Sequence, residues 1–257
     1  MLLCKNISKT FYAGTANERQ ALVDVNLNLR RGEFVVVIGG NGSGKSTLLN
    51  TVSGSIQSDA GRIYIDKEDV TFVPEHKRAA YIGRVFQDPM LGTASTMTIE
   101  ENLALANRRG KRRGLGSGVT RAERALFKEM LAPLDLGLED RLTARVGLLS
   151  GGQRQALTLL MASLRDPKVL LLDEHTAALD PKTAAKVLEI SLQLVREHHL
   201  TTLMVTHNMG DALNFGDRLI MMQEGRIIFE ATGKEKASLT VPDLVEKFVS
   251  VGSEVVC

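Results

Sequence analysis

The segment GGNGSGKST, residues 39–47, restricts the fold of this chain more than any other stretch. It follows FVVVIG, residues 34–39, an apolar run with the length and composition of a buried parallel strand. It then opens into a helical pattern that ends near Gly54. A glycine-rich turn between a buried strand and a helix is the context that the phosphate-loop pattern requires, so an ordinary turn is the weaker alternative.

The spacing within this segment indicates what the loop can bind. Its glycines allow backbone N–H groups to close around phosphate oxygens at the start of a helix. We expect Lys45 to reach the β- and γ-phosphates of a nucleotide and Ser46 to ligate magnesium. The expected nucleotide contacts in the loop are Gly39, Asn41, Gly42, Ser43, Gly44, Lys45, Ser46 and Thr47.

A second anion site is predicted in LLSGGQRQAL, residues 148–157. Ser150 is expected to be a helix N-cap, and the glycines after it leave the first N–H groups of the helix open to a ligand. The helix dipole favours an anion at that position. The sequence therefore predicts two phosphate-binding helix starts in a chain with one phosphate loop.

Two carboxylates end the apolar run VLLLDE, residues 169–174. In enzymes with a phosphate loop, an acid at the position of Asp173 holds magnesium, and Glu174 is placed to polarise an attacking water. Strand ends often carry exposed acids, so this pair is informative only together with the phosphate loop.

Two further polar residues close apolar strands. His207 follows LMVT, and a parallel sheet would bring it to the same edge as Lys45 and Asp173, where we expect it to contact the γ-phosphate. A solvated strand-end histidine is the alternative. Gln87 ends the expected strand 79–87 and is predicted to ligate magnesium or position water, the alternative being a turn residue before Asp-Pro.

The order of the hydrophobic patterns predicts an α/β fold with a helical insert. Strand patterns fill residues 2–38, helical patterns dominate 93–165, and strands and helices alternate from residue 168 onward around a parallel core. TRAE at 120–123 has capping-box spacing, and Pro133 is expected to break the helix that it starts. The predicted parts of the single domain 1–257 are an α/β core with a β subdomain, 1–87 and 166–257, and a helical subdomain, 88–165.

The composition excludes several classes of protein. With a formal net charge of +2, the chain lacks the positive charge that attracts nucleic acid, and no nucleic-acid partner is expected. Its apolar runs are too short to span a bilayer and its N-terminus lacks a secretory signal, so we expect a cytosolic protein. Cys4 and Cys257 are expected to be free thiols, and the basic run 108–114 to be a solvated loop.

In this order the motifs resemble those of one family, the ATP-binding subunits of ABC transporters. GGNGSGKST is similar to the family's Walker A motif, VLLLDE to its Walker B motif, and LSGGQ at 149–153 to its signature. Gln87, ALD at 178–180 and His207 are similar to the Q-loop, the D-loop and the switch histidine. The resemblance covers the chain throughout and implies a P-loop NTPase core of ABC ATPase type, with an N-terminal antiparallel β part and an inserted helical subdomain.

The resemblance also implies a use for the second anion site. In this family two subunits pack head to tail, and each ATP, with Mg2+, lies between the phosphate loop of one chain and the signature of the other. Ser150, Gly151 and Gly152 would bind the γ-phosphate held by Lys45 of the other copy in a homodimer. Further implied nucleotide contacts are Gln153, Asp180 and Phe11, which would stack on adenine, with Tyr12 as the alternative.

The implied activity is ATP hydrolysis that drives a separate membrane permease, at the cytoplasmic face of the membrane. Permease subunits would contact the helical subdomain near Asp88 and Pro89. A finer similarity to uptake systems, some of them for aromatic amino acids, favours an importer of amino acids or another small solute, with an extracytoplasmic substrate-binding protein. The alternatives are an exporter ATPase and a non-transport ABC protein that acts on DNA or ribosomes.

One residue departs from the family pattern. The family usually has proline after the Walker B glutamate, whereas this chain has His175. The expectation is that histidine places a titratable group beside the γ-phosphate and makes ATP turnover sensitive to pH.

Overall fold

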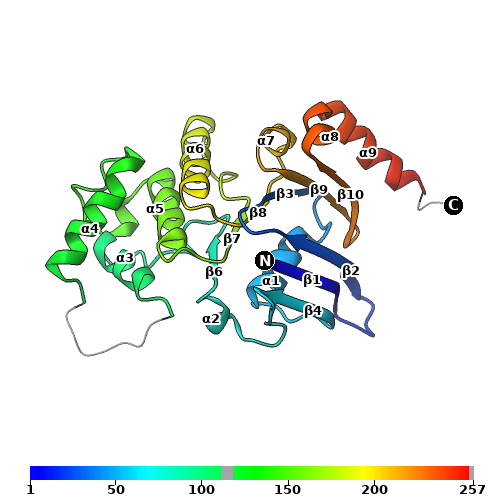
Figure 1. Ribbon diagram of the computed structural model, residues 1–257, viewed down its shortest axis with the longest axis horizontal. Coiled ribbons are helices and arrows are strands. Elements are labelled where there is room, and N and C mark those ends of the chain that lie inside the picture. The colour runs from blue at the N-terminus through cyan, green and yellow to red at the C-terminus, as the bar shows by residue number, and fades with distance from the viewer. Residues whose placement is uncertain (111–117, 255–257) are drawn as a thin grey trace. The chain divides into compact units, whose positions relative to one another are not determined.

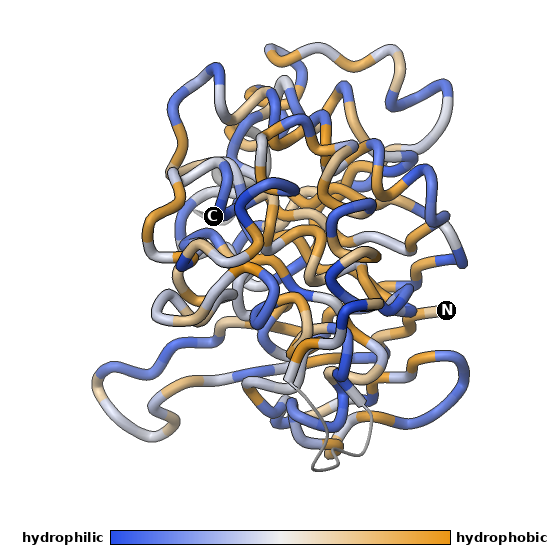
Figure 2. The backbone as a smooth tube through the Cα atoms, turned by 90° about the vertical axis from the view of Figure 1, so that its left-hand side faces the viewer, coloured by the Kyte–Doolittle hydropathy of each residue, from blue (hydrophilic) through white to orange (hydrophobic). Residues whose placement is uncertain are grey.

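The chain folds into two α/β units in the computed structural model, which describes residues 1–110 and 118–254 (Figure 1). The first unit joins Met1–Arg78 to the chain from Thr201 onward, and the second is Ala79–Leu200. Much of the interior of the trace is hydrophobic, and many of the outer loops are hydrophilic (Figure 2).

The first unit begins with an antiparallel sheet. Alternation along its second strand buries Val25, Leu27 and Leu29 and exposes the polar residues between them, as expected of a sheet with one face on the core. This sheet confirms the predicted N-terminal antiparallel β part. Its order is β2-β1-β4-β5, formed by β1 (Leu2–Phe11), β2 (Arg19–Leu29), β4 (Ala60–Ile65) and β5 (Glu68–Asp69).

A second group of strands in the first unit carries the phosphate loop. The apolar strand β3 (Phe34–Gly39) pairs in parallel with β8 (Thr202–Val205) and with β9 (Arg218–Gln223), while β10 (Arg226–Thr232) runs antiparallel to β9. Because β3 and β8 are parallel neighbours, the loop after β3 and His207 after β8 leave the sheet at the same edge. The expectation that Lys45 and His207 share an edge is confirmed.

Five helices belong to the described part of the first unit. The helix after the phosphate loop starts at Lys45 and ends at Ser53, close to the expected end at Gly54. The two C-terminal helices were not predicted from the sequence. The helices are α1 (Lys45–Ser53), α2 (Glu75–Arg78), α7 (Met209–Asn214), α8 (Gly233–Ser238) and α9 (Val241–Glu254).

The second unit combines a parallel strand pair with the helices around it. The pair is β6 (Ile82–Val85) and β7 (Val169–Asp173), so β6 is shorter than the expected strand 79–87, because Gln87 already lies in a bend. The α-helices of its described part are α3 (Ile99–Asn107), α4 (Arg121–Leu131), α5 (Gly151–Ser163) and α6 (Pro181–Glu197), and the 3-10 helices are η1 (Ala132–Leu134) and η2 (Val146–Leu148).

Side-chain caps fix where the helices of the second unit begin. Thr120 and Glu123 form the predicted capping box, and Pro133 lies in the 3-10 turn where α4 ends, so both expectations are confirmed. Thr98 and Glu101 form an equivalent box at the start of α3. Among the described helices, none has the length and hydrophobicity of a membrane span.

The division into units differs from the predicted subdomain boundaries. The second unit contains β6, β7 and α6 in addition to the segment 88–165, because β6 pairs with β7 and α6 packs against α5. A helical subdomain limited to 88–165 therefore stays a prediction.

Two sequence expectations concern exposed and terminal segments. Arg109, in the basic run 108–114, is not a solvated side chain, since its guanidinium donates to the carbonyls of Met161 and Ala162 at 3.0 Å. Burial lowers the pKa of Arg109. Residues 111–114 of that run lie outside the described residues, as does Cys257, while Cys4 is a buried free thiol as expected.

Candidate nucleotide-binding site

The phosphate loop is shaped by close contacts at its glycines. A Cβ atom on Gly39 would lie 2.5 Å from both Met222 O and Ser43 Oγ, and one on Gly44 would overlap Ala21 O. Gly44 also has a φ of 103°, which side chains with L chirality rarely adopt. Glycine is therefore required at both positions, and α1 starts directly after the loop with its first N–H groups available to an anion.

Lys45 points back over the loop. Its ammonium group donates to Gly39 O at 2.8 Å and to Gly40 O at 3.0 Å, and the residue is 6% exposed. Two backbone carbonyls thus hold the positive charge at the loop, where a phosphate would provide a stronger, charged acceptor.

A pocket lies beside the loop in the first unit. Phe11 lines it, whereas Tyr12 does not and is 72% exposed, so the geometry favours Phe11 as the stacking residue. Arg19, for which no sequence pattern predicted a role, also lines the pocket and donates to Gly42 O at 2.8 Å. The full lining is Phe11, Arg19, Ala21, Gly42, Ser43, Gly44, Lys45, Ser46 and Thr47.

The remaining predicted residues of the first unit lie nearby on the same elements. Asn41 lines a neighbouring hollow with Gln223 and Glu224. His207 is exposed at the end of β8, one turn from Asp211 on α7. Burial raises the pKa of Asp211, and the charge of His207 partly opposes that rise. The His207 side chain is thus exposed at the edge of the sheet where the phosphate loop also emerges.

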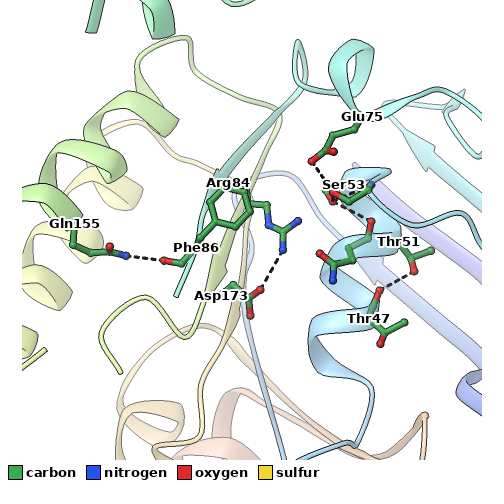
Figure 3. Close-up of polar contacts among 10 residues, drawn as sticks. Thr47, Thr51, Ser53, Glu75, Arg84, Phe86, Gln155 and Asp173 are labelled. Atoms are coloured by element: carbon green, nitrogen blue, oxygen red, sulfur yellow. Dashed lines mark hydrogen bonds and ion pairs between the residues drawn. The ribbon is translucent and has the colours of Figure 1, made fainter. Parts of the chain in front are cut away.

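In the second unit, Asp173 is already paired with a cation. Arg84 Nη2 lies 3.2 Å from Asp173 Oδ2, and the two side chains are 11% and 13% exposed (Figure 3). Gln87 is exposed just beyond β6. Because β6 and β7 are parallel, Gln87 and Asp173 emerge at the same edge of this pair.

Glu174 has an unusual backbone conformation. Its φ is 42°, in the left-handed region, which costs a non-glycine residue on the order of 1 kcal/mol. Residues held in this way tend to lie at functional sites. The turn after β7 therefore sets the direction of the Glu174 side chain.

The predicted N-cap at Ser150 is confirmed and forms a complete capping box. Gln153 N donates to Ser150 Oγ and Ser150 N donates to Gln153 Oε1, both at 3.2 Å. The Gln153 amide also donates to Leu136 O at 3.1 Å. Gln153, which was expected to contact nucleotide, therefore uses its side chain to hold the signature helix in place.

The two signature glycines pack against the D-loop and the first turn of α6 in their own chain. A Cβ atom on Gly151 would lie 3.2 Å from Leu179 Cδ2, and one on Gly152 would overlap the Thr183 γ-methyl group. Asp180 caps α6 by accepting a hydrogen bond from Thr183 N at 3.1 Å. Hydrogen bonds with the Thr183 side chain and then with its backbone lower the pKa of the Asp180 carboxyl. The predicted contacts Gly151, Gly152 and Asp180 are thus brought together by the second unit alone.

Gln155 is a further residue that the sequence analysis missed. It is completely buried in α5, and its amide donates to Phe86 O at 3.0 Å, one residue before Gln87 (Figure 3). The available signal was a glutamine inside the apolar part of a helix, where a polar group needs a partner. The contact connects the signature helix to the start of the Q-loop.

The expectation for His175 is wrong. Its side chain is 2% exposed, and Nε2 lies 2.8 Å from Ser191 Oγ on α6. Ser191 Oγ donates to Val187 O, so it accepts from His175 Nε2–H. Burial lowers the pKa of His175 to about 4. The imidazole is therefore a neutral packing group at neutral pH, not a titrating group at the phosphates.

The buried imidazole predicts a dependence of stability on pH. Above pH 6.5 His175 is neutral in both states, whereas between pH 6.5 and 4 the unfolded chain binds a proton that the folded chain does not. This histidine should lower the free energy of unfolding by up to about 3 kcal/mol over that range. Thermal unfolding of the parent and of His175→Gln from pH 7.5 to 4.5 measures it. The prediction would be contradicted if the free energies of unfolding of the two proteins differed by the same amount at every pH.

The contact between Gly152 and Thr183 predicts a steric effect within one chain. Gly152→Ala should lower the free energy of unfolding by about 1–3 kcal/mol, because the new methyl group overlaps the Thr183 methyl group. Adding Thr183→Ser removes that methyl group and should restore part of the loss. Gly118→Ala is the control, since no atom of the described residues lies within 4 Å of its Cβ position. Chemical denaturation measures all four proteins, and equal losses for the two alanine variants would refute the contact.

Comparisons with known proteins agree with this geometry. Residues 22–177 match the family model described as ABC transporter. The chain is 47% identical over 248 residues to the tyrosine transport ATP-binding protein of Clostridioides difficile (strain R20291). This match covers 96% of this chain and 98% of that protein. It is 37% identical to the sulfate/thiosulfate import ATP-binding protein CysA of Halalkalibacterium halodurans, covering 88% of this chain and 60% of that protein.

Solved structures give the same assignment. The dimeric, post-hydrolysis structure of the ATP-binding cassette MJ0796 with ADP and Pi is 35% identical, with a TM-score of 0.76, and the match covers 90% of this chain and 98% of that one. This chain therefore belongs to the ABC transporter family, as one of its ATP-binding cassettes.

Proposed function

We propose that this chain is the ATP-hydrolysing subunit of an ABC importer, and that aromatic amino acids are the solutes its system takes up. The observation that carries the first part is the phosphate loop, where required glycines and a lysine held by carbonyls surround the start of α1. The tyrosine transport relative, which matches over nearly the whole of both chains, supports the second part.

Each loop residue has a role in nucleotide binding. Lys45 exchanges its two carbonyl acceptors for the β- and γ-phosphates of ATP, Phe11 stacks on adenine, and the N–H groups at the start of α1 hold phosphate oxygens. The donor set also fits magnesium, which takes one or two carboxylates, hydroxyls and phosphate oxygens instead of an all-protein cage. Among the described residues, no three His, Cys, Asp or Glu side chains gather as such a cage.

The proposed metal ligands are the Ser46 hydroxyl, the Gln87 amide and the Asp173 carboxylate. The pairing of Asp173 with Arg84 supports this role, since it shows the carboxylate in contact with a cation. Bound magnesium would neutralise charge on the phosphates. Glu174 accepts a proton from the attacking water, and His207 donates to the γ-phosphate.

The second anion site serves the nucleotide of a second copy. Ser150 and the N–H groups of Gly151 and Gly152 form an intact helix start. A side chain on Gly152 would collide with Thr183 of α6, and one on Gly151 would press on Leu179 of the D-loop. The dimeric cassette among the structural relatives supports such an assembly. ATP then closes the homodimer and hydrolysis reopens it.

The cassette acts with other subunits. We place it at the cytoplasmic face of the membrane, where permease subunits contact the surface around Met90 and Leu91, which are 45% and 69% exposed. An extracytoplasmic binding protein supplies the solute. Affinity purification of the tagged chain from its native membrane tests this, and recovery of a permease supports it, whereas recovery of ribosomes or of an exporter would overturn it.

The role of Lys45 gives a direct binding prediction. Lys45→Ala should weaken the binding of a fluorescent ATP analogue at least about tenfold, since it removes the cation at the β- and γ-phosphates. Lys128→Ala, which removes a lysine that is 54% exposed on α4, is the control and should bind like the parent. Equal affinities for the parent and Lys45→Ala would remove the basis of the assignment.

The role of Glu174 gives a prediction about turnover. Glu174→Gln keeps the shape and loses the basic carboxylate, so ATP should bind normally while hydrolysis slows at least about a hundredfold. A dimer trapped by ATP should appear in size-exclusion chromatography. The control Glu189→Gln changes an exposed glutamate on α6. Turnover within a few fold of the parent would place water activation elsewhere, with His207 the next residue to test.

A further inference from the structure

We infer that Arg84 is an internal counter-cation of Asp173 which magnesium displaces, so that Arg84 sets how much metal the protein needs to bind nucleotide. This inference rests on the proposed function, because it takes Asp173 as a magnesium ligand. Neither the family motifs nor the sequence pattern selected Arg84.

The strand register places the two side chains together. In the parallel pair of β6 and β7, Arg84 lies opposite Leu171, and Asp173 follows two residues later on the same face. The resulting distance from Arg84 Nη2 to Asp173 Oδ2 is 3.2 Å. The contact is therefore built into adjacent strands of one unit and does not depend on a loop.

A second contact holds the guanidinium in position. Arg84 lies over the ring of Phe86, with 4.5 Å from its guanidinium carbon to the ring centroid (Figure 3). Phe86 itself is fixed by the hydrogen bond from the buried Gln155 amide to its carbonyl. Arginine is suited to this arrangement because its flat, delocalised cation can stack on an aromatic ring while it donates to a carboxylate.

Burial makes this pair stronger than a surface ion pair. The two side chains are only 11% and 13% exposed, so water screens their attraction weakly, and removing one partner leaves the other charge partly desolvated. Asp173 therefore has a resident cation before any metal arrives, and that cation orients the carboxylate.

Magnesium and the guanidinium compete for the same carboxylate. A magnesium ion binds oxygen at about 2.1 Å, so a metal on Asp173 would lie close to a guanidinium that is 3.2 Å from the carboxylate oxygen. Two cations at such a separation repel each other strongly in a partly buried site. Metal binding therefore has to move Arg84 away or weaken its contact, and this opposes metal binding.

The test measures metal dependence and not hydrolysis. Binding of a fluorescent ATP analogue is titrated with Mg2+ from an EDTA-treated, metal-free state, for the parent and for Arg84→Gln. Arg84→Gln should lower the Mg2+ concentration at half-maximal effect about threefold to tenfold, because no guanidinium has to be displaced. Arg84→Lys keeps the charge and should stay closer to the parent.

A merely structural role of Arg84 would change stability but would not lower the metal requirement. If the Mg2+ concentration at half-maximal effect, the midpoint of the titration, is unchanged or higher in Arg84→Gln, the inference is overturned while the proposed function stays intact. If nucleotide binding by the parent has no dependence on Mg2+, the metal role of Asp173 fails as well, so the two failures are distinguishable.

Two further variants guard against loss of folding. If circular dichroism shows that Arg84→Gln is unfolded, Phe86→Leu replaces it, since it loosens the guanidinium without removing a charge. A lower midpoint again supports the inference, and an unchanged one overturns it. In an Asp173→Asn background, Arg84→Gln should have no effect on the midpoint, and a persistent shift would show that Arg84 acts on another group.

Discussion

The architecture of this cassette depends on glycines whose backbone lies so close to neighbouring atoms that a side chain would not fit. At Gly39 and Gly44 these contacts fold the loop around the start of α1, and at Gly152 they bring the signature helix onto the first turn of α6. Both places are helix N-termini, where N–H groups remain open to an anion. Glycine therefore does two things at once, because it permits the packing and leaves the phosphate a path to the backbone.

Two charged residues of the proposed nucleotide site, one in each unit, are held by partners within the chain. Lys45 donates to backbone carbonyls, and Asp173 accepts from Arg84. Such contacts keep the side chains near the geometry that a ligand needs and avoid the penalty of an unpaired buried charge. They also have to be exchanged when ligands bind, so affinity for nucleotide and metal reflects a difference between two sets of contacts.

Local patterns explain what the sequence could predict. The phosphate loop, the Ser150 cap and the shared edge of Lys45 and His207 follow from residue spacing and from parallel strand order. The contacts of Arg84 and the burial of His175 join residues far apart in the chain, and a linear pattern does not specify which side chains meet. The position of His175 beside the γ-phosphate was predicted from its neighbours in sequence, but the turn after β7 directs its side chain toward Ser191 on α6. The helices α8 and α9 lack a strong motif and went unpredicted.

The central claim, that each ATP is held by two chains, is tested most directly by complementation. Ser150→Asp keeps the helix cap but adds a negative charge at the second anion site, without a collision such as any side chain at Gly152 would cause. It is mixed with Lys45→Ala, both in a Glu174→Gln background, and ATP retention in the dimer is measured. The account predicts little retention by either variant alone and partial retention by the mixture, since one interface then joins an intact loop to an intact signature. Ser150→Asn, a cap without charge, should behave like the parent. Full retention of ATP in a dimer of Ser150→Asp alone would contradict the shared site.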